Sequence, residues 1–219
     1  MVMANYLDLV NDVLVRLREP EVTSVTQNAY TKLISKFVND AKEEVENAWD
    51  WSHLRTTITV NTVSGTFGYV LSTSGTRMEV LNVLNDTSNW FMDYKTAQEF
   101  TDWYRNMDDV KTGSPAYYSF NGLDANEDTI IEVYPKPDDV YTLRFNLIVR
   151  PTELVNNDDP VYAPHRPIIM LALAKAIEER GEDGGISSTS AYATAQRLLN
   201  DAIAFDAAKH PEELIFREV

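Results

Sequence analysis

Apolar residues recur every three or four positions along residues 27–51, and the period then changes abruptly. The apolar positions of this stretch are Tyr30, Leu33, Ile34, Phe37, Val38, Ala41, Val45, Ala48 and Trp49. The polar residues on the other side of the same helix are Lys36, Asp40, Lys42, Glu43, Glu46 and Asn47. This spacing predicts one apolar stripe on a helix. From residue 56 to residue 60 polar and apolar residues alternate, which predicts a strand directly after the helix.

Two further helices follow from the same spacing at the beginning of the chain and after residue 151. Residues 6–17 predict a first helix that ends near Arg18, because Pro20 cannot continue it. Ser24 or Thr26 is then expected to cap the helix of residues 27–51. Residues 164–180 predict a third helix, apolar on almost every side and therefore buried, which ends at Gly181.

A fourth helix is expected after Gly181, with Ser188 or Ser190 as its cap and an end near residue 210. Its apolar stripe consists of Tyr192, Ala195, Leu198, Leu199, Ala202, Ile203 and Phe205. These four helices are of the length and amphipathic character that pack together in bundles.

Strand patterns dominate residues 55–151. Residues 63–66 predict a hairpin turn between strands 56–61 and 67–71, and residues 135–139 predict a second hairpin between strands 129–134 and 141–149. Residues 90–94 predict one further strand, and Thr96 opens a short amphipathic helix.

The order of the elements indicates an α+β protein. We expect residues 1–54 and 152–210 to form a four-helix bundle from the N- and C-terminal helices. An antiparallel β region with one short helix, residues 55–151, is inserted into it. Residues 211–219 are left as an extended C-terminal tail.

Composition narrows the function. The 219 residues carry 34 acidic and 19 basic side chains, a net charge of −15, which disfavours tight binding to nucleic acid or to anionic membranes. The absence of cysteine excludes disulfides and thiol chemistry. The N-terminus lacks a basic secretion signal, and the most apolar run, residues 168–177, is too short to span a bilayer. The sequence therefore predicts a soluble protein.

Few residues form a pattern typical of catalysis or metal binding. Residues His53, His165 and His210 have no zinc-type spacing and are expected to cap or pack, and no phosphate-binding loop occurs. Asp124, Asn126 and Asp128 match only the start of a calcium loop. The doublets Asp108-Asp109, Asp138-Asp139 and Asp158-Asp159 fall in turns. We expect no enzyme, cofactor or metal, although a carboxylate-dependent hydrolase remains an alternative.

Aromatic residues offer an interaction surface. Trp49 and Trp103 lie on apolar stripes and are expected in the core. The pairs Trp90-Phe91 and Tyr117-Tyr118 lie on strands, so at least one ring of each pair must face outward. Outward aromatic rings favour contact between subunits at Trp90, Phe91, Tyr117 and Tyr118. A carbohydrate- or receptor-binding module is the second alternative.

Three short stretches resemble the head-to-tail adaptor proteins of tailed bacteriophages, similar to tail tubular protein A. These are residues 9–20, from Leu9-Val10-Asn11-Asp12 to Glu19-Pro20; the cluster Ala48-Trp49-Asp50-Trp51 before the first strand; and residues 164–176 with the last helix and tail.

The resemblance implies a structural virion protein of the neck, made in the host cytoplasm. It implies a ring, commonly of twelve copies, between the portal protein and the tail nozzle or fibres, through which DNA passes without specific binding. It also implies that the C-terminal tail reaches the portal. Leu214, Ile215 and Phe216, followed by Arg217, are an apolar patch suited to that contact.

Overall fold

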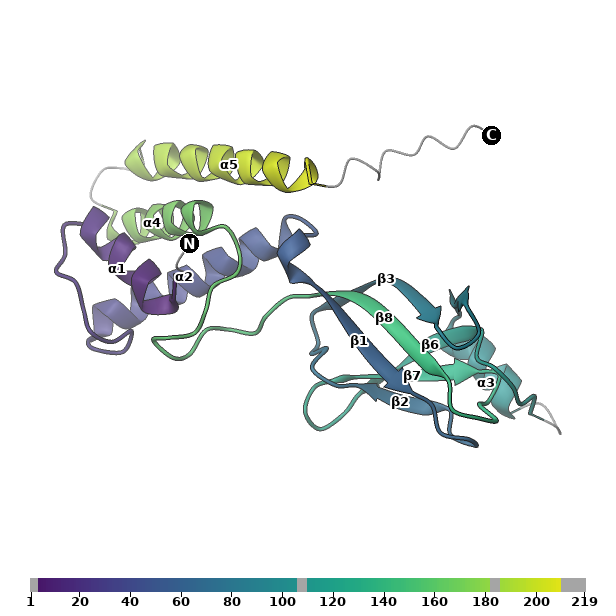
Figure 1. The fold of residues 1–219 in the computed structure, drawn as a ribbon. Coiled ribbons are helices and arrows are strands. Elements are labelled where there is room, and N and C mark those ends of the chain that lie inside the picture. Colours follow the sequence, from purple (N-terminus) through teal and green to yellow (C-terminus); the bar gives the residue numbers. More distant parts are fainter. Residues whose placement is uncertain (1–3, 106–109, 182–185, 210–219) are drawn as a thin grey trace. The chain divides into compact units, whose positions relative to one another are not determined.

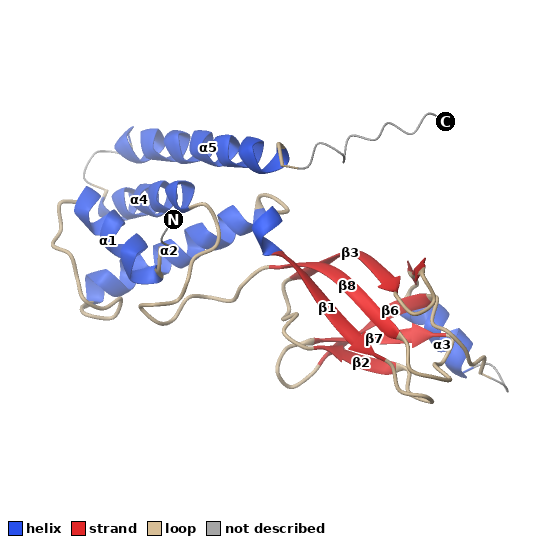
Figure 2. Cartoon of the chain, viewed as in Figure 1, coloured by secondary structure: helices blue, strands red, loops and turns tan. Residues whose placement is uncertain are grey.

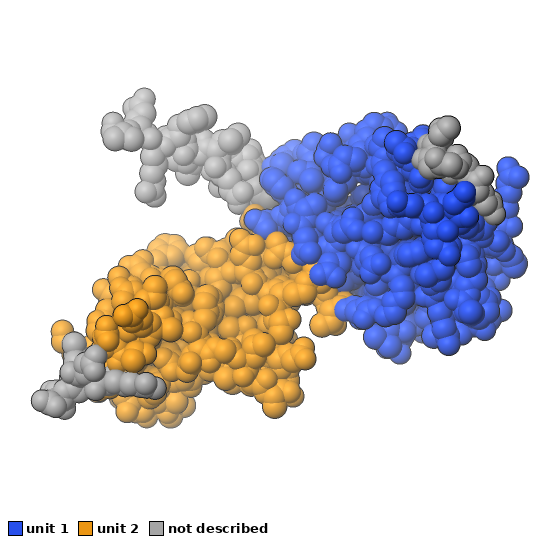
Figure 3. All heavy atoms as spheres, turned by 180° about the vertical axis from the view of Figure 1, so that it is seen from behind, with its two compact units in different colours: residues 1–53, 153–219 blue, residues 54–152 orange. Residues whose placement is uncertain are grey.

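The computed structural model describes residues 4–105, 110–181 and 186–209, and its helices and strands follow the predicted order. Helices from the two ends of the chain pack together, and two four-stranded sheets lie between them in the sequence (Figure 1; Figure 2). The predicted α+β class is therefore confirmed. The chain divides into two compact units, Met1–His53 with Glu153–Val219 and Leu54–Thr152 (Figure 3).

The helical unit is centred on α4. Its helices are α1 (Tyr6–Arg16), α2 (Ala29–Asn47), α4 (His165–Arg180) and α5 (Ile186–Ala207). Helix α4 packs against each of the other three, as its apolar residues on nearly every side predicted. Ile168, Ala172 and Ala176 are among its buried residues.

The helix ends differ in part from the prediction. Asn5 caps α1 in a capping box with Asp8, and Gly181 ends α4 in the left-handed conformation, as expected for that glycine. Asn28, and not Ser24 or Thr26, caps α2 by accepting a hydrogen bond from the Thr31 amide at 2.8 Å.

The serines expected to cap the last helix lie inside it. Helix α5 begins at Ile186, so Ser188 and Ser190 are in its first turns, and it ends at Ala207. The segments at the start of α2 and α5 each contain several serine or threonine residues of a type that caps helices. Their spacing in the sequence does not show which residue is the cap.

Hydrogen bonds attach the segment that follows the β region to α1 and α2. The Asn39 side chain accepts a bond from the Leu154 amide and donates one to the Leu154 carbonyl, each at 3.0 Å. The Tyr6 hydroxyl donates to the Ser35 carbonyl at 2.7 Å, and the Tyr6 amide donates to the Asp159 carbonyl at 3.0 Å. Segments distant in the sequence are thereby fixed side by side.

The β unit contains two sheets that share one core. The first has the order β1 (Arg55–Asn61), β8 (Thr142–Val149), β3 (Met78–Asn85) and β4 (Trp90–Phe91). The second has the order β2 (Gly68–Leu71), β7 (Thr129–Tyr134), β6 (Tyr117–Leu123) and β5 (Asp93–Tyr94). Helix α3 (Ala97–Arg105) follows β5, and a short 3₁₀ turn, Ser52–Leu54, precedes β1. Leu71, Val83, Ile131, Val133 and Phe145 are buried between the sheets.

Both expected hairpins are wrong. Strand β1 pairs with β8, and β2 pairs with β7, so residues 63–66 connect the two sheets and do not close a hairpin. Strands β7 and β8 also belong to different sheets, so residues 135–139 form a second connection between sheets. Turn residues mark where the chain reverses, but they do not specify whether the flanking strands pair or face each other across a core.

The expected strand at residues 90–94 is two short strands in different sheets. Strand β4 pairs antiparallel with β3, whereas β5 pairs parallel with β6. Strands β6 and β7 pair antiparallel, and buried residues alternate with more exposed ones along most of β8. Among the described strands of the β region, all pairs are antiparallel apart from β5 and β6, and the isolated bridge of Thr112 with Lys136 is also parallel.

Burial assignments on the helices are also corrected. Lys42 and Glu46, expected on the polar side of α2, are buried with 2% and 0% of their surface exposed. Trp49 and Phe205, expected on apolar stripes, are exposed at 37% and 77%. Trp49 lies beyond the end of α2 at Asn47, so the helical period no longer determines its direction.

Candidate assembly surfaces

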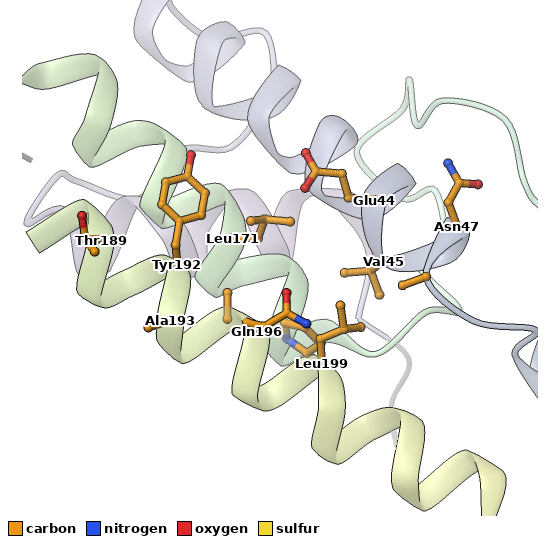
Figure 4. A pocket seen from close by; sticks show the side chains of 12 residues that line it. Glu44, Val45, Asn47, Leu171, Thr189, Tyr192, Ala193, Gln196 and Leu199 are labelled. Carbon is orange, nitrogen blue, oxygen red and sulfur yellow. The ribbon is translucent and has the colours of Figure 1, made fainter.

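A groove in the helical unit lies between α2, α4 and α5 (Figure 4). Its volume is about 810 Å³. The groove exists because α5 packs along α4, while its contact with α2 is slight among the described residues. The residues that line it are Glu44, Val45, Asn47, Ala48, Pro167, Leu171, Thr189, Tyr192, Ala193, Ala195, Gln196 and Leu199.

The lining of the groove is apolar, with polar groups at its rim. Val45, Leu171 and Leu199 are contributed by α2, α4 and α5 respectively. At the rim Lys175 pairs with Glu44 at 2.7 Å, and the Tyr192 hydroxyl donates to Glu178 at 2.7 Å. Burial and the hydrogen bond to the Glu178 carboxylate raise the pKa of Tyr192 to about 12, so this hydroxyl stays protonated at physiological pH. A surface of this kind suits an apolar segment of protein more than a reacting substrate.

The last turn of α5 is attached to the chain just beyond α2. The buried Asp206 carboxylate accepts hydrogen bonds from the Ser52 amide at 2.8 Å and the Ser52 hydroxyl at 2.6 Å. Lys209 donates to the same carboxylate at 3.0 Å. Burial acts to raise the pKa of Asp206, but the bonds from Ser52 and Lys209 outweigh it and lower the pKa to about 2.

His53 and His165 occupy packing and helix-terminal positions, as the sequence indicated. The His53 ring lies 5.7 Å from the Trp51 ring, and burial lowers its pKa. His165 is the first residue of α4, and its Nε2 atom lies 3.1 Å from the Val161 carbonyl oxygen. His210 lies outside the described residues.

In the β unit two of the four expected interface aromatics are on the surface. Trp90 and Phe91 are exposed at 42% and 65%. Tyr117 is half-buried, with Lys95 5.7 Å from the centre of its ring, whereas Tyr118 belongs to the core between the sheets. Trp90 and Phe91 are therefore the members of this set that another molecule can reach.

The aromatic residues around α3 pack against one another. Trp103 lies 5.3 Å from Tyr117 and 4.6 Å from Tyr134, between ring centres. Phe100 is buried in the same cluster. Trp103 therefore packs against rings of its own unit, but it is half-buried and does not lie fully in the core as expected.

The acidic residues considered as ligands or catalysts mostly bond to nearby backbone. Asp124 accepts hydrogen bonds from the amides of Asn126 and Asp128 at 2.8 and 2.9 Å, an arrangement that closes a turn. Asp159 does the same with the amides of Val155 and Asn156, and these bonds lower its pKa.

Two further doublets were candidates. Asp138 accepts a bond from the Tyr141 hydroxyl at 2.7 Å, and the Asp139 carboxylate accepts one from the adjacent Val140 amide at 2.7 Å. Asp108-Asp109 lie outside the described residues. Within residues 4–105, 110–181 and 186–209, no group of three or more histidine, aspartate or glutamate side chains is arranged to hold a metal ion.

The residues expected to contact the portal follow the described part of α5 in the sequence. Leu214, Ile215, Phe216 and Arg217 lie outside the described residues. The described part of α5 reaches Ala207, and Lys209 follows it beside Ser52.

Sequence reasoning missed the buried polar groups. Lys42 and Glu46 form an ion pair one turn apart on α2, with Nζ 3.0 Å from Oε1. Their spacing is that of a helical ion pair, but such pairs usually lie on the surface. Asp206 was missed because its neighbour Phe205 fits the apolar spacing, although Asp206 is the residue that turns inward.

Comparison with known proteins gives one family. The family model described as SU10 adaptor protein matches residues 4–212, which includes both units of the chain. No curated protein matches the sequence. No helix within residues 4–105, 110–181 and 186–209 is both long enough and apolar enough to cross a bilayer.

Proposed function

Because the chain belongs to the SU10 adaptor protein family, a family of structural rather than catalytic phage proteins, we propose that it forms the adaptor ring between portal and tail. The observation that carries the proposal is the match over residues 4–212, which covers the helical ends and the inserted β unit together. The role is structural: the ring joins two assemblies and leaves a channel for DNA.

Exposed apolar side chains in both units support an assembly function. Phe205 and Trp49 are exposed in the helical unit, and Trp90 and Phe91 are exposed in the β unit. Large exposed aromatic residues are typical of surfaces that another protein covers. We assign Trp90, Phe91 and the half-buried Tyr117 to contacts between neighbouring copies, with Tyr118 supporting them from the core.

The charge of the chain supports passage of DNA. Each copy carries −15, so a ring of twelve copies would present a strongly acidic assembly. Phosphates are repelled by such a surface, and DNA can move through without being held. The protein would therefore neither grip DNA nor select a sequence.

The C-terminal segment is proposed as the portal contact. Leu214, Ile215 and Phe216 are three consecutive apolar residues, and Arg217 adds a cation that an acidic portal surface could pair. The opposite end of the ring would meet the tail nozzle or fibre proteins. The mature location is the virion neck.

Electron microscopy of the purified protein mixed with its portal tests the proposal. We expect a collar on the portal, with twelve copies by image classification. A variant with Leu214, Ile215 and Phe216 replaced by serine should keep the fold, measured by circular dichroism, and lose the collar. The matched control, Glu212→Gln with Glu213→Gln, should keep the collar. A portal that remains bare with the unmodified protein would refute the proposed function.

A further inference from the structure

Lys209, after which the C-terminal segment begins, lies ten positions beyond Leu199 of the groove between α2, α4 and α5. Lys209 donates hydrogen bonds to Asp206 at 3.0 Å and to the Ser52 hydroxyl at 3.4 Å. Ser52 follows Ala48, a lining residue of the groove, by four positions. The root of the segment is thus fixed close to the end of the groove that α2 contributes.

The groove presents apolar surface to whatever enters it. Leu171 and Leu199, both half-buried, lie along it with the exposed Ala48 and Ala193, and its volume of about 810 Å³ falls in the range of sites that bind several apolar groups. Water in contact with this lining is released when apolar side chains replace it, which favours binding.

The segment is long enough to reach the groove in its own chain. Gln196, in the groove, precedes Lys209 by 13 positions on or just beyond α5, a distance of about 20 Å at 1.5 Å per residue. Phe216 follows Lys209 by seven positions, which span up to about 24 Å when extended. A chain that turns back along α5 can therefore place Leu214, Ile215 and Phe216 over the lining.

We propose that in the free subunit Leu214, Ile215 and Phe216 occupy the α2–α4–α5 groove of their own chain. The short connection to Lys209 gives the segment a millimolar effective concentration at the groove, so even weak apolar contacts suffice to hold it there. Occupancy covers two apolar surfaces that would otherwise face water in an unassembled subunit. Occupancy of the groove in the free subunit does not depend on the proposed function. Release of the segment when the portal binds does depend on it.

Disulfide trapping tests the occupancy without the portal, because the chain contains no cysteine of its own. Glu218→Cys, which lies outside the residues proposed to contact the portal, is combined with Gln196→Cys, at the groove, or with Arg197→Cys, the next residue of α5, which does not line it. Gln196 and Arg197 are both exposed, so neither replacement disturbs the core. A disulfide forms only when the two Cα atoms come within about 7 Å.

Under mild oxidation we expect the pair with Gln196→Cys to form an intramolecular disulfide about tenfold faster than the pair with Arg197→Cys. Serine at residues 214–216 should remove that difference. Equal rates for the two pairs would overturn the proposal. A disulfide between two chains, seen as a dimer on a denaturing gel, would also overturn it and assign the groove to a second copy.

A second measurement separates this proposal from the portal role. The trapped variant is added to the portal before and after reduction. If the segment serves both surfaces, only the reduced protein forms a collar. A trapped protein that binds the portal equally well would show that occupancy of the groove does not regulate assembly, and a reduced protein that fails to bind would refute the portal contact alone.

Discussion

Asp206 accepts two hydrogen bonds from Ser52, from its amide at 2.8 Å and its hydroxyl at 2.6 Å, across 154 positions of sequence. The carboxylate is almost fully buried, with 4% of its side chain exposed. The bond attaches the last turn of α5 to the point where the chain leaves α2 for the β region. One buried charge therefore holds the end of α5 against the segment that follows α2.

Replacing Asp206 by asparagine should lower stability in a pH-dependent way. The folded pKa of about 2 lies below the ordinary value of 3.8, so the ionised group stabilises the fold above about pH 4, and this contribution is lost as the pH falls from 4 to 2. We expect Asp206→Asn to reduce the free energy of unfolding by about 2 kcal/mol at pH 7 and by much less at pH 2.5. Urea unfolding at both pH values measures the difference.

The control for this change is Asp201→Asn, because Asp201 is exposed on the same helix. Its replacement should alter stability by less than about 0.5 kcal/mol at either pH. A cost for Asp206→Asn that is the same at pH 7 and pH 2.5 would show that the ionised form is not what the hydrogen bonds stabilise.

The ion pair of Lys42 and Glu46 leads to a second prediction. Its two side chains are 3% and 0% exposed, so removing one partner leaves a charge buried without that partner. Glu46→Leu should cost about 3 to 5 kcal/mol, and the double replacement Lys42→Met with Glu46→Leu should recover most of that loss. A double-mutant cycle measured by chemical unfolding tests this; a double variant as unstable as Glu46→Leu would contradict it.

Helix positions were predictable from the sequence because the apolar period extends over many residues. The buried Lys42 and Glu46 were not, because a charged residue is assigned to the surface unless a partner is known, and burial depends on how α4 packs against α2. The groove was also beyond prediction, since it arises from the slight contact of α5 with α2 and not from any local motif.

Strand positions were predictable, but strand partners were not. The segments around Gly65 and Pro137 contain ordinary turn residues, and each joins two sheets. A hairpin and a connection between facing sheets use the same residues, and the choice depends on long-range pairing such as that of Ile58 with Phe145. Of the aromatic residues expected at the interface, Trp90 and Phe91 are exposed and Tyr118 is buried. The sequence pattern alone did not distinguish them.

The two tryptophans beyond α2 should differ in their effect on stability. Trp51 is 1% exposed and donates from Nε1 to the Val45 carbonyl at 2.8 Å, whereas Trp49 is 37% exposed. Trp51→Phe removes that donor and leaves a buried carbonyl acceptor with one bond fewer, at a cost of about 1 to 3 kcal/mol. Trp49→Phe, the matched control, should change stability by less than about 0.5 kcal/mol. Thermal unfolding of both variants measures the contrast, and equal costs would contradict it.

The last prediction concerns assembly. Phe91 is 65% exposed on the two-residue strand β4, and its strand partner is Leu84. Replacing an exposed ring by serine removes little that the free subunit uses, so Phe91→Ser should leave its stability within about 0.5 kcal/mol. If the ring is covered by a neighbouring copy, the same change should cost at least about 1 kcal/mol per contact in the assembled ring.

Val140→Ser is the matched control, because Val140 is 61% exposed in a loop of the same unit. The concentration of protein needed to form collars on the portal, measured by electron microscopy and sedimentation, should rise for Phe91→Ser and stay unchanged for Val140→Ser. Because every copy in a ring contributes the same contact, a small loss per contact is repeated around the ring and becomes a large loss of assembly. Equal collar formation by both variants would remove Phe91 from the contact between copies.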